Sequence, residues 1–308
     1  MDSVLADFSG YLAADELYDG PYGVLSIVDN HRFKRLIYEV LDHGPTTKDI
    51  TPFFQRFHEA LKARGLSLRG ITTDGSALYP EPIRQVFGSG VKHQVCAFPV
   101  LQEITKAILK AVTRTRRQLH AQKTQTGRGR SSSKKARAVA RQNRRLQQRI
   151  KDLFDHRHLF VKRTLTPREK RILPRVTRGF PSLRALRSIM DQVYGLFDRR
   201  CRTETALEKL GRLRARVRRF RSLHEALSKR FSPKVEKALR FLDDSLLPAT
   251  SNAVERGHRR HRKMQKTVDR VRTGPTISRR IALDMQRDLH APARYQTIIT
   301  LHQQRETG

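Results

Sequence analysis

The stretch that decides the fold is residues 11–41, YLAADELYDGPYGVLSIVDNHRFKRLIYEVL. It holds three runs rich in leucine, β-branched and aromatic side chains, at 11–18, 23–29 and 33–41, separated by Gly, Pro, Asp and Asn. Short runs of this kind between turn-forming residues are typical of strands. Because the intervening turns are short, we expect the three strands to pair in succession as an antiparallel meander.

The residues after this meander alternate between helical and strand-like patterns. A helix that begins after Thr46 or Thr47 and stops at Gly65 is indicated by apolar side chains at the 3.6-residue period, namely Ile50, Phe53, Phe54, Phe57, Ala60 and Leu61. A strand at 66–73, a helical turn at 82–87 and a strand at 91–98 follow. The order predicts the α/β class, with helices covering a meander that parallel strands extend.

From residue 100 onward the pattern is helical almost throughout. Residues 124–135, TQTGRGRSSSKK, interrupt it as a basic linker rich in Gly and Ser. One predicted helix covers 100–123, and a second covers 136–160 with Leu146, Ile150 and Phe154 on one side. A single amphipathic helix is predicted through the leucines of 207–227, and a last basic helix from Asn252 to about Val268.

The chain carries a large and unevenly distributed positive charge. Its 308 residues include 64 Lys and Arg against 29 Asp and Glu, a net charge of +35. Residues 1–100 hold 10 basic and 12 acidic side chains, whereas residues 101–308 hold 54 and 17. Self-repulsion on this scale excludes an average metabolic enzyme and favours a polyanionic partner.

The apolar runs, the N-terminal residues and the cysteines indicate the cellular compartment of the protein. No apolar run approaches the ~20 residues that span a bilayer, and the start, MDSVLADFSG, is acidic where a signal peptide is basic. The two cysteines, Cys96 and Cys201, cannot form a disulfide framework and lack a C-x-x-C partner. We therefore expect a cytoplasmic protein with no membrane partner. The absence of Trp favours binding through phosphate charge over base stacking.

Three acids are candidates for chemistry. Asp15 lies in the first predicted strand, and Asp74, followed by Gly75, lies where the fourth strand ends, which is a suitable place for a metal ligand. A plain turn at Asp74 and a solvated strand position for Asp15 are the alternatives. For Glu255, the alternative is a capping box with Asn252, although this does not explain the basic residues that follow Glu255.

Four stretches, in this order, carry a family resemblance: AADELYDG from Ala13, GITTDGSALYPEPI from Gly70, HQVCAFPVLQEITK from His93 and TSNAVERGHRRHRKMQK from Thr250. With them the chain resembles the catalytic region of a bacterial insertion-sequence transposase of the DDE class, allied to the mutator-like group. Together they span nearly the whole chain.

The resemblance implies a ribonuclease-H-like mixed sheet with a large basic all-α insertion before the glutamate-bearing helix. On this basis 1–100 is the core, 101–247 is the insertion with its linker at 124–135, and 248–308 holds the core helix and a basic tail. It also implies that Asp15, Asp74 and Glu255 bind two Mg²⁺ or Mn²⁺ ions, with Asp15 bridging them, for DNA cleavage and strand transfer. The implied partners are double-stranded DNA, at the element ends and the target, and further copies of the chain as a dimer or higher oligomer. The implied location is the prokaryotic cytoplasm, at the nucleoid.

Two departures from the family pattern leave an alternative open. Where the family has a histidine three residues after the cysteine that corresponds to Cys96, this chain has Pro99. The first strand begins by about Tyr11, so we expect a catalytic region without its N-terminal DNA-binding domain. The alternative is a degenerate or truncated remnant that only binds DNA. A ribosomal type of RNA-binding protein would explain the charge but not the three acids.

The basic residues are expected to bind DNA phosphates in two places. His258 and His261 lie one helical turn apart without a third ligand nearby, so no zinc site is predicted there. The expected phosphate contacts are Arg256, Arg259, Arg260, Arg262, Lys263 and Lys266 on the helix of Glu255, and Arg128, Arg130, Lys134 and Lys135 in the linker, with the arginines of 212–221 further away.

Overall fold

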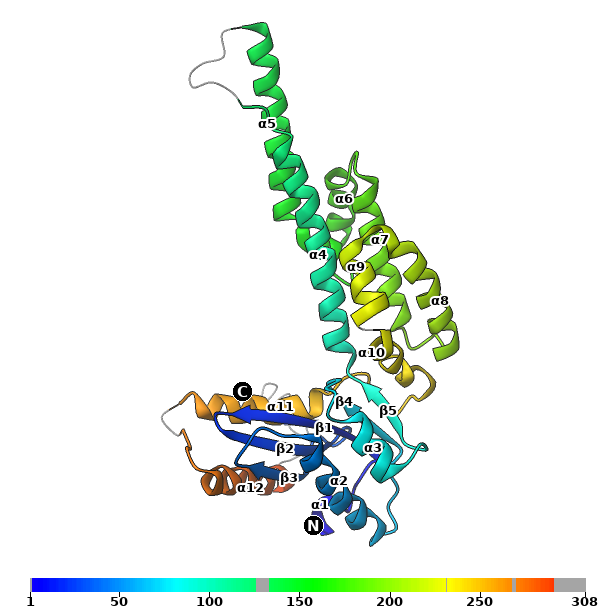
Figure 1. Cartoon of the computed structure of the whole chain (residues 1–308), viewed down its shortest axis with the longest axis vertical. Coiled ribbons are helices and arrows are strands. Elements are labelled where there is room, and N and C mark those ends of the chain that lie inside the picture. The colour runs from blue at the N-terminus through cyan, green and yellow to red at the C-terminus, as the bar shows by residue number, and fades with distance from the viewer. Residues whose placement is uncertain (1, 126–132, 231, 268–269, 291–308) are drawn as a thin grey trace, which may run out of the picture. The chain divides into compact units, whose positions relative to one another are not determined.

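The computed structural model describes residues 2–125, 133–230, 232–267 and 270–290. The chain divides into two compact units, one formed by 1–96 with 244–308 and the other by 97–243. All strands of the described residues belong to the first unit, and the second is helical (Figure 1).

The first unit is built on a mixed five-stranded sheet. Its strands are β1 (Tyr11–Asp19), β2 (Tyr22–Asp29), β3 (Arg35–Leu41), β4 (Gly70–Thr73) and β5 (Lys92–Val95). Their order across the sheet is β3-β2-β1-β4-β5. Strands β1, β2 and β3 form the predicted antiparallel meander, and β4 pairs parallel to both β1 and β5. The mixed α/β class is therefore confirmed.

Alternation along β1 distributes its side chains between two cores. Leu12 and Ala14 join a buried cluster with residues of the helices α1 (Asp2–Leu5), α2 (Thr47–Lys62) and α3 (Pro80–Phe87). Ala13 and Leu17 instead contact the helices α11 (Asn252–Gln265) and α12 (Gly274–His290). Helices thus cover both faces of the sheet, and β1 is buried on both sides, as its near-continuous apolar sequence requires.

Several element boundaries differ from the sequence prediction. The strand predicted at 66–73 pairs only over β4, and the strand predicted at 91–98 ends at Val95 because α4 (Ala97–Ala121) begins two residues later. The third strand starts at Arg35, since Phe33 has a φ of 60°, which belongs to a turn. Helix α12, in the region expected only as a basic tail, packs Ile277 and Ile281 against the sheet.

The second unit consists of packed helices. Its elements are α4, α5 (Lys134–Asp155), η1 (Arg157–Phe160), α6 (Pro167–Val176), α7 (Pro181–Leu196), α8 (Thr203–Arg216), η2 (Val217–Arg219), α9 (Arg221–His224), η3 (Glu225–Arg230), α10 (Ser232–Lys237) and η4 (Arg240–Asp243). The single helix predicted through 207–227 was wrong, because it is divided into α8, η2, α9 and η3. Phe154, expected on the apolar side of α5, is 48% exposed, and Leu153 is buried in its place. No helix within the described ranges has both the length and the apolarity of a bilayer span.

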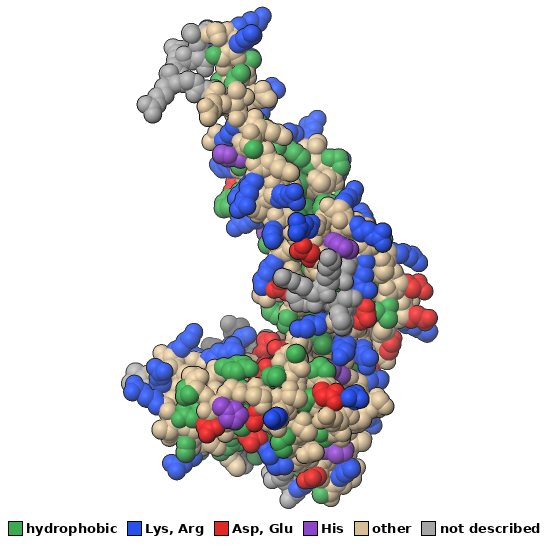
Figure 2. All heavy atoms as spheres, viewed as in Figure 1, with side chains coloured by type: hydrophobic (Ala, Val, Ile, Leu, Met, Phe, Trp, Pro, Cys, Tyr) green, Lys and Arg blue, Asp and Glu red, His purple; other side chains and the backbone are tan. Residues whose placement is uncertain are grey.

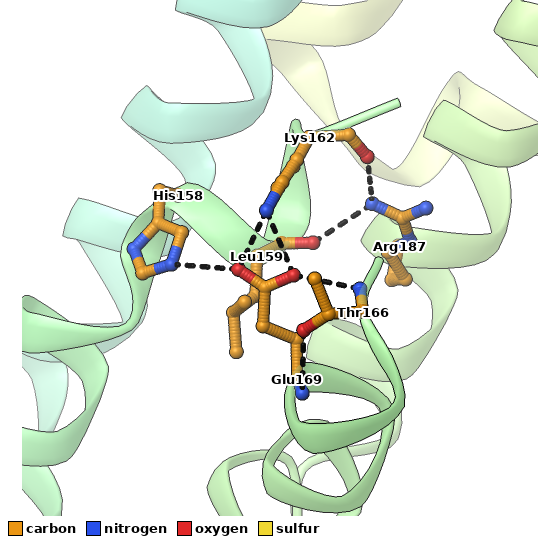
Figure 3. A network of polar contacts seen from close by, with 6 residues as sticks. All are labelled: His158, Leu159, Lys162, Thr166, Glu169 and Arg187. Carbon is orange, nitrogen blue, oxygen red and sulfur yellow. Dashed lines mark hydrogen bonds and ion pairs between the residues drawn. The ribbon is translucent and has the colours of Figure 1, made fainter. Parts of the chain in front are cut away.

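A network around Glu169 ties the start of α6 to the preceding segment (Figure 3). Lys162 Nζ donates to both carboxylate oxygens of Glu169 at 2.8 Å. The backbone N–H of Thr166 donates to Glu169 Oε2 at 2.8 Å, and the Thr166 hydroxyl accepts from the Glu169 N–H at 3.3 Å, which completes a capping box. Beside it, Arg187 Nη1 donates to the carbonyl oxygens of Leu159 and Lys162.

This network makes the stability of the second unit depend on acid pH. The hydrogen bond from Lys162, followed by that from the Thr166 N–H, lowers the pKa of Glu169 from 4.5 to about 2. A lowered folded-state pKa stabilises the fold above the unfolded-state value, and this contribution is lost as the pH falls from 4.5 to about 2. We expect urea unfolding of Glu169→Gln to lack this part of the pH dependence. Lys162→Met should weaken this pH dependence in the protein that keeps Glu169. In the Glu169→Gln protein, the further change Lys162→Met should leave the pH profile as it is in Glu169→Gln alone. A wild-type profile in Glu169→Gln would contradict the assignment.

Candidate metal centre and basic surfaces

The sheet brings Asp15 and Asp74 together. Strands β1 and β4 run parallel, and their register pairs Ala13 with Thr72. Asp15 lies two residues beyond this pair on β1, and Asp74 follows Thr73 at the carboxyl end of β4. Because β4 is the shorter strand and ends beside the middle of β1, two residues 59 positions apart in the sequence become neighbours.

A third acid joins them. Asp15, Glu16 and Asp74 each offer a carboxylate oxygen, and these three oxygens lie within 4.8 Å of one another. Within the described residues, the group therefore contains Glu16 where the sequence analysis expected Glu255. Three hard oxygen donors at this separation fit Mg²⁺ or Mn²⁺ and do not fit a soft metal.

Like charges lie close together in this group. Burial raises the pKa of Glu16, a hydrogen bond with Tyr79 lowers it, the negative charges of Asp74 and Asp15 raise it, and a hydrogen bond with Ser76 lowers it. Among the described residues, the second carboxylate oxygen of Glu16, Oε2, is buried without a hydrogen-bond partner. Burial, followed by the charge of Glu16, also raises the pKa of Tyr79 well above its usual value. A buried carboxylate oxygen among like charges is suited to a cation, so these residues fit the expected divalent ion.

The Asp74 side chain is held by its own turn. Its Oδ1 accepts the backbone N–H of Ser76 at 2.7 Å, and Gly75 has a φ of 92°, which a glycine adopts without strain. The turn that the sequence analysis weighed as an alternative is therefore present, and it orients an acid that belongs to the cluster.

Helix α11 carries Glu255 across one face of the sheet. It begins at Asn252, and its N-cap is Ser251, which makes no side-chain capping bond. The capping box of Asn252 and Glu255, weighed as an alternative role for this acid, is not formed. The Ser251 N–H donates to Cys96 Sγ at 3.4 Å, so the buried cysteine after β5 fixes the start of the helix. Glu255 is half-buried in the first turn of α11, one turn before His258.

Two histidines of α11 contact aspartates of β1. His258 is 1% exposed, and its Nδ1 lies 3.2 Å from Asp15 Oδ2. His261 Nε2 lies 2.7 Å from Asp19 Oδ2, and Gln265 Nε2 donates to the same oxygen. Ala253 and Val254 pack against Ala13 and Val28. Helix α11 therefore lies along β1, with Glu255 and His258 in the part nearest Asp15.

Sequence analysis missed Glu16 and His258 for different reasons. Because side chains alternate along a strand, Glu16 and Asp15 belong to opposite faces of the sheet. The shorter strand β4 ends beside them, so both acids can approach Asp74, which follows that end. For His258 a signal was present. Asp15 and Asp19 share one face of a strand, and His258 and His261 share one face of a helix, so matching the two pairs would have indicated that the elements pack together.

The basic residues of α11 are not equivalent. Arg260 forms a bidentate ion pair with Asp288 of α12, so this predicted phosphate contact has a partner within the protein. The Arg256 guanidinium lies over the ring of Phe33, 5.4 Å from its centroid. The remaining predicted contacts on the helix are all exposed, and they are Arg259, Arg262, Lys263 and Lys266.

A larger basic surface lies in the second unit, on the hairpin of α4 and α5. The two helices pack side by side (Figure 1), and basic side chains follow them in Figure 2. No Asp or Glu occurs from residue 104 to residue 151, a stretch with 16 Lys and Arg. Its described exposed basic residues are Lys106, Lys110, Arg114, Arg117, Lys134, Lys135, Arg137, Arg141, Arg144, Arg145, Arg149 and Lys151. Arg128 and Arg130 lie outside the described residues.

Pro99 lies in the first turn of α4. A proline is tolerated there because the N–H that it lacks would have no partner within the helix. No family model matches the chain, and neither a curated protein nor a solved structure matches it.

Proposed function

We propose that the chain is a DNA transposase of the DDE class, which cleaves a DNA strand and transfers it with the help of divalent metal ions. The observation that carries the proposal is the group of Asp15, Glu16 and Asp74, whose carboxylate oxygens lie within 4.8 Å of one another where β4 ends beside the middle of β1. Helix α11 carries Glu255 one turn before His258, the histidine that contacts Asp15.

The fold supports this proposal. A meander extended by parallel strands, with helices on both faces, agrees with the ribonuclease-H-like core that the resemblance implies. The order of the chain agrees as well, because the helical unit 97–243 is inserted between β5 and the helix that bears Glu255.

In the proposed mechanism the acids hold the ions and the basic residues hold the DNA. Two divalent ions bound there would supply charge stabilisation to the attacking and the leaving oxygen of an in-line displacement at phosphorus. We assign their binding to Asp15, Asp74 and Glu255, with Glu16 as a fourth acid. The Ser76 N–H keeps the Asp74 carboxylate oriented, which lowers the cost of assembling the site. Exposed basic residues of α11, such as Arg259 and Arg262, bind phosphates that flank the scissile bond.

A second candidate function is that of a DNA-binding protein that keeps this fold without the reaction. Pro99 favours it, because it stands where the family has a histidine. The two candidates share the prediction of DNA binding and differ in whether the acids are required for cleavage.

The two glutamates provide a first test. We expect Glu255→Gln to lower Mn²⁺-dependent nicking of a supercoiled plasmid by at least ~10²-fold, because it removes a metal ligand but keeps the size of the side chain. Glu16→Gln should reduce nicking less and should raise the thermal stability of the metal-free protein, since it removes a half-buried charge from among like charges. Full nicking by Glu255→Gln with none by Glu16→Gln would show that Glu16 is the third ligand and that the assignment of Glu255 is wrong.

A further inference from the structure

His258 combines burial with incomplete hydrogen bonding. The residue is 1% exposed, yet within the described part of the chain neither ring nitrogen has a hydrogen-bond partner of good geometry. The nearest charged group is the carboxylate of Asp15, whose Oδ2 is 3.2 Å from Nδ1. Burying a polar ring in this way is costly, so packing alone does not explain a histidine at this position. A leucine or methionine would fill the same space without that cost.

The neighbouring histidine shows that α11 does not need His258 as an anchor. His261 Nε2 lies 2.7 Å from Asp19 Oδ2, where Gln265 also donates a hydrogen bond. Gln265 Nε2 also donates to the Val271 carbonyl oxygen, and Gln265 Oε1 accepts the Val271 N–H. Together with the apolar contacts of Val254, this network already fixes α11 on β1. The two histidine–aspartate pairs therefore differ in two respects: His261 forms a hydrogen bond of good geometry with Asp19, and only the partner of His258 belongs to the acidic group.

We propose that His258 is a positioning residue of the metal centre, and this inference rests on the function proposed above. In the tautomer with the proton on Nδ1, this N–H lies against Asp15 Oδ2 at 3.2 Å between nitrogen and oxygen, a polar contact without the angle of a regular hydrogen bond. This contact restricts rotation of the carboxylate, so that the Asp15 carboxylate stays directed toward the space that it shares with Glu16 and Asp74. Hydrogen-bonded partners of ligating carboxylates commonly contribute ~10- to 100-fold to metal affinity.

The same contact bears on Glu255. Because Glu255 lies one turn before His258 on a continuous helix, the position of His258 against Asp15 sets how far along β1 that glutamate lies. His258 thus links an acid of the sheet to the acid of the helix, although the two are 240 residues apart in the chain.

Mn²⁺ binding to the full chain tests this proposal without depending on DNA cleavage. Binding is measured from the electron paramagnetic resonance signal of unbound Mn²⁺ during titration. We expect His258→Ala to weaken Mn²⁺ binding by ~10- to 100-fold. His258→Asn should recover most of the affinity, since its amide nitrogen takes the place of Nδ1, whereas His258→Gln, whose amide corresponds to Nε2, should not.

His261→Ala is the matched control. It removes a buried histidine–aspartate contact from the same helix, so its melting temperature should fall while its Mn²⁺ affinity stays at the wild-type value. Wild-type affinity in His258→Ala, an equal loss in His261→Ala, or equal recovery by Asn and Gln at position 258 would overturn the inference and leave the metal centre standing. If the wild type binds no Mn²⁺, or if Asp15→Asn and Asp74→Asn bind it equally well, the proposed metal centre fails and the role of His258 fails with it.

Discussion

Replacing Asp74 with asparagine is expected to lower metal-dependent DNA cleavage by at least ~10³-fold, because a charged metal ligand supplies several kcal/mol of transition-state stabilisation. The substitution suits the structure, since the asparagine Oδ1 can still accept the Ser76 N–H that Asp74 accepts at 2.7 Å. The turn at Gly75 should therefore persist. Cleavage is measured as nicking of a supercoiled plasmid in Mg²⁺ or Mn²⁺, and metal-free buffer gives the background.

The same substitution should act on stability in the opposite direction. The charge of Asp74 raises the pKa of the half-buried Glu16, so removing that charge makes the ionised form of Glu16 less costly. We expect the metal-free Asp74→Asn protein to melt at a temperature equal to or above that of the wild type. Asp42→Asn, at a side chain that is 91% exposed, is the control and should change neither property. Equal nicking by wild type and Asp74→Asn would place the nuclease activity outside this site or in a contaminant.

The sheet of the first unit could be predicted because local patterns and buried contacts agree there. The three runs within 11–41 pair as expected, and the apolar period from Ile50 to Leu61 forms α2, whose aromatic rings fill the core. The positions of Asp15 within the first strand and of Asp74 at the end of the fourth follow from the order of strands alone. Such features need only the period of the sequence and the topology of the sheet.

The features that could not be predicted depend on how distant elements dock. The leucines of 207–227 keep a helical spacing, but the chain leaves α8 after Arg216 and turns at Phe220, which has a φ of −109° and a ψ of 87°. The spacing of apolar residues does not reveal such a break, because each of the short helices keeps the same helical spacing. Likewise, the contact of His258 with Asp15 depends on the register of α11 along β1, which tertiary packing sets and local sequence does not.

The basic hairpin of the second unit leads to the other large expected effect. Lys134, Arg137, Arg141 and Arg145 are spaced by three or four residues, so they form one stripe along α5. Eleven residues of helix place its ends about 16 Å apart, which spans several phosphates of one DNA strand. Within the described residues, none of the four forms an ion pair with an acidic side chain, and no acid occurs between 104 and 151. The stripe is thus suited to bind the DNA backbone independently of sequence.

Changing all four to glutamine should weaken binding to a 30-base-pair duplex by about 10- to 100-fold at 0.15 M salt, and should reduce the slope of log K against log salt by about 0.9 for each phosphate that the protein no longer neutralises. Glutamine keeps helix propensity, so α5 should remain folded. The affinity is measured by fluorescence anisotropy over a range of salt concentrations. The matched control changes Arg168, Lys170, Arg171 and Arg175 of α6 to glutamine, which removes the same charge from exposed positions of the same unit. If net charge alone determines binding, the two variants will lose affinity equally, and the stripe on α5 will not be a DNA site.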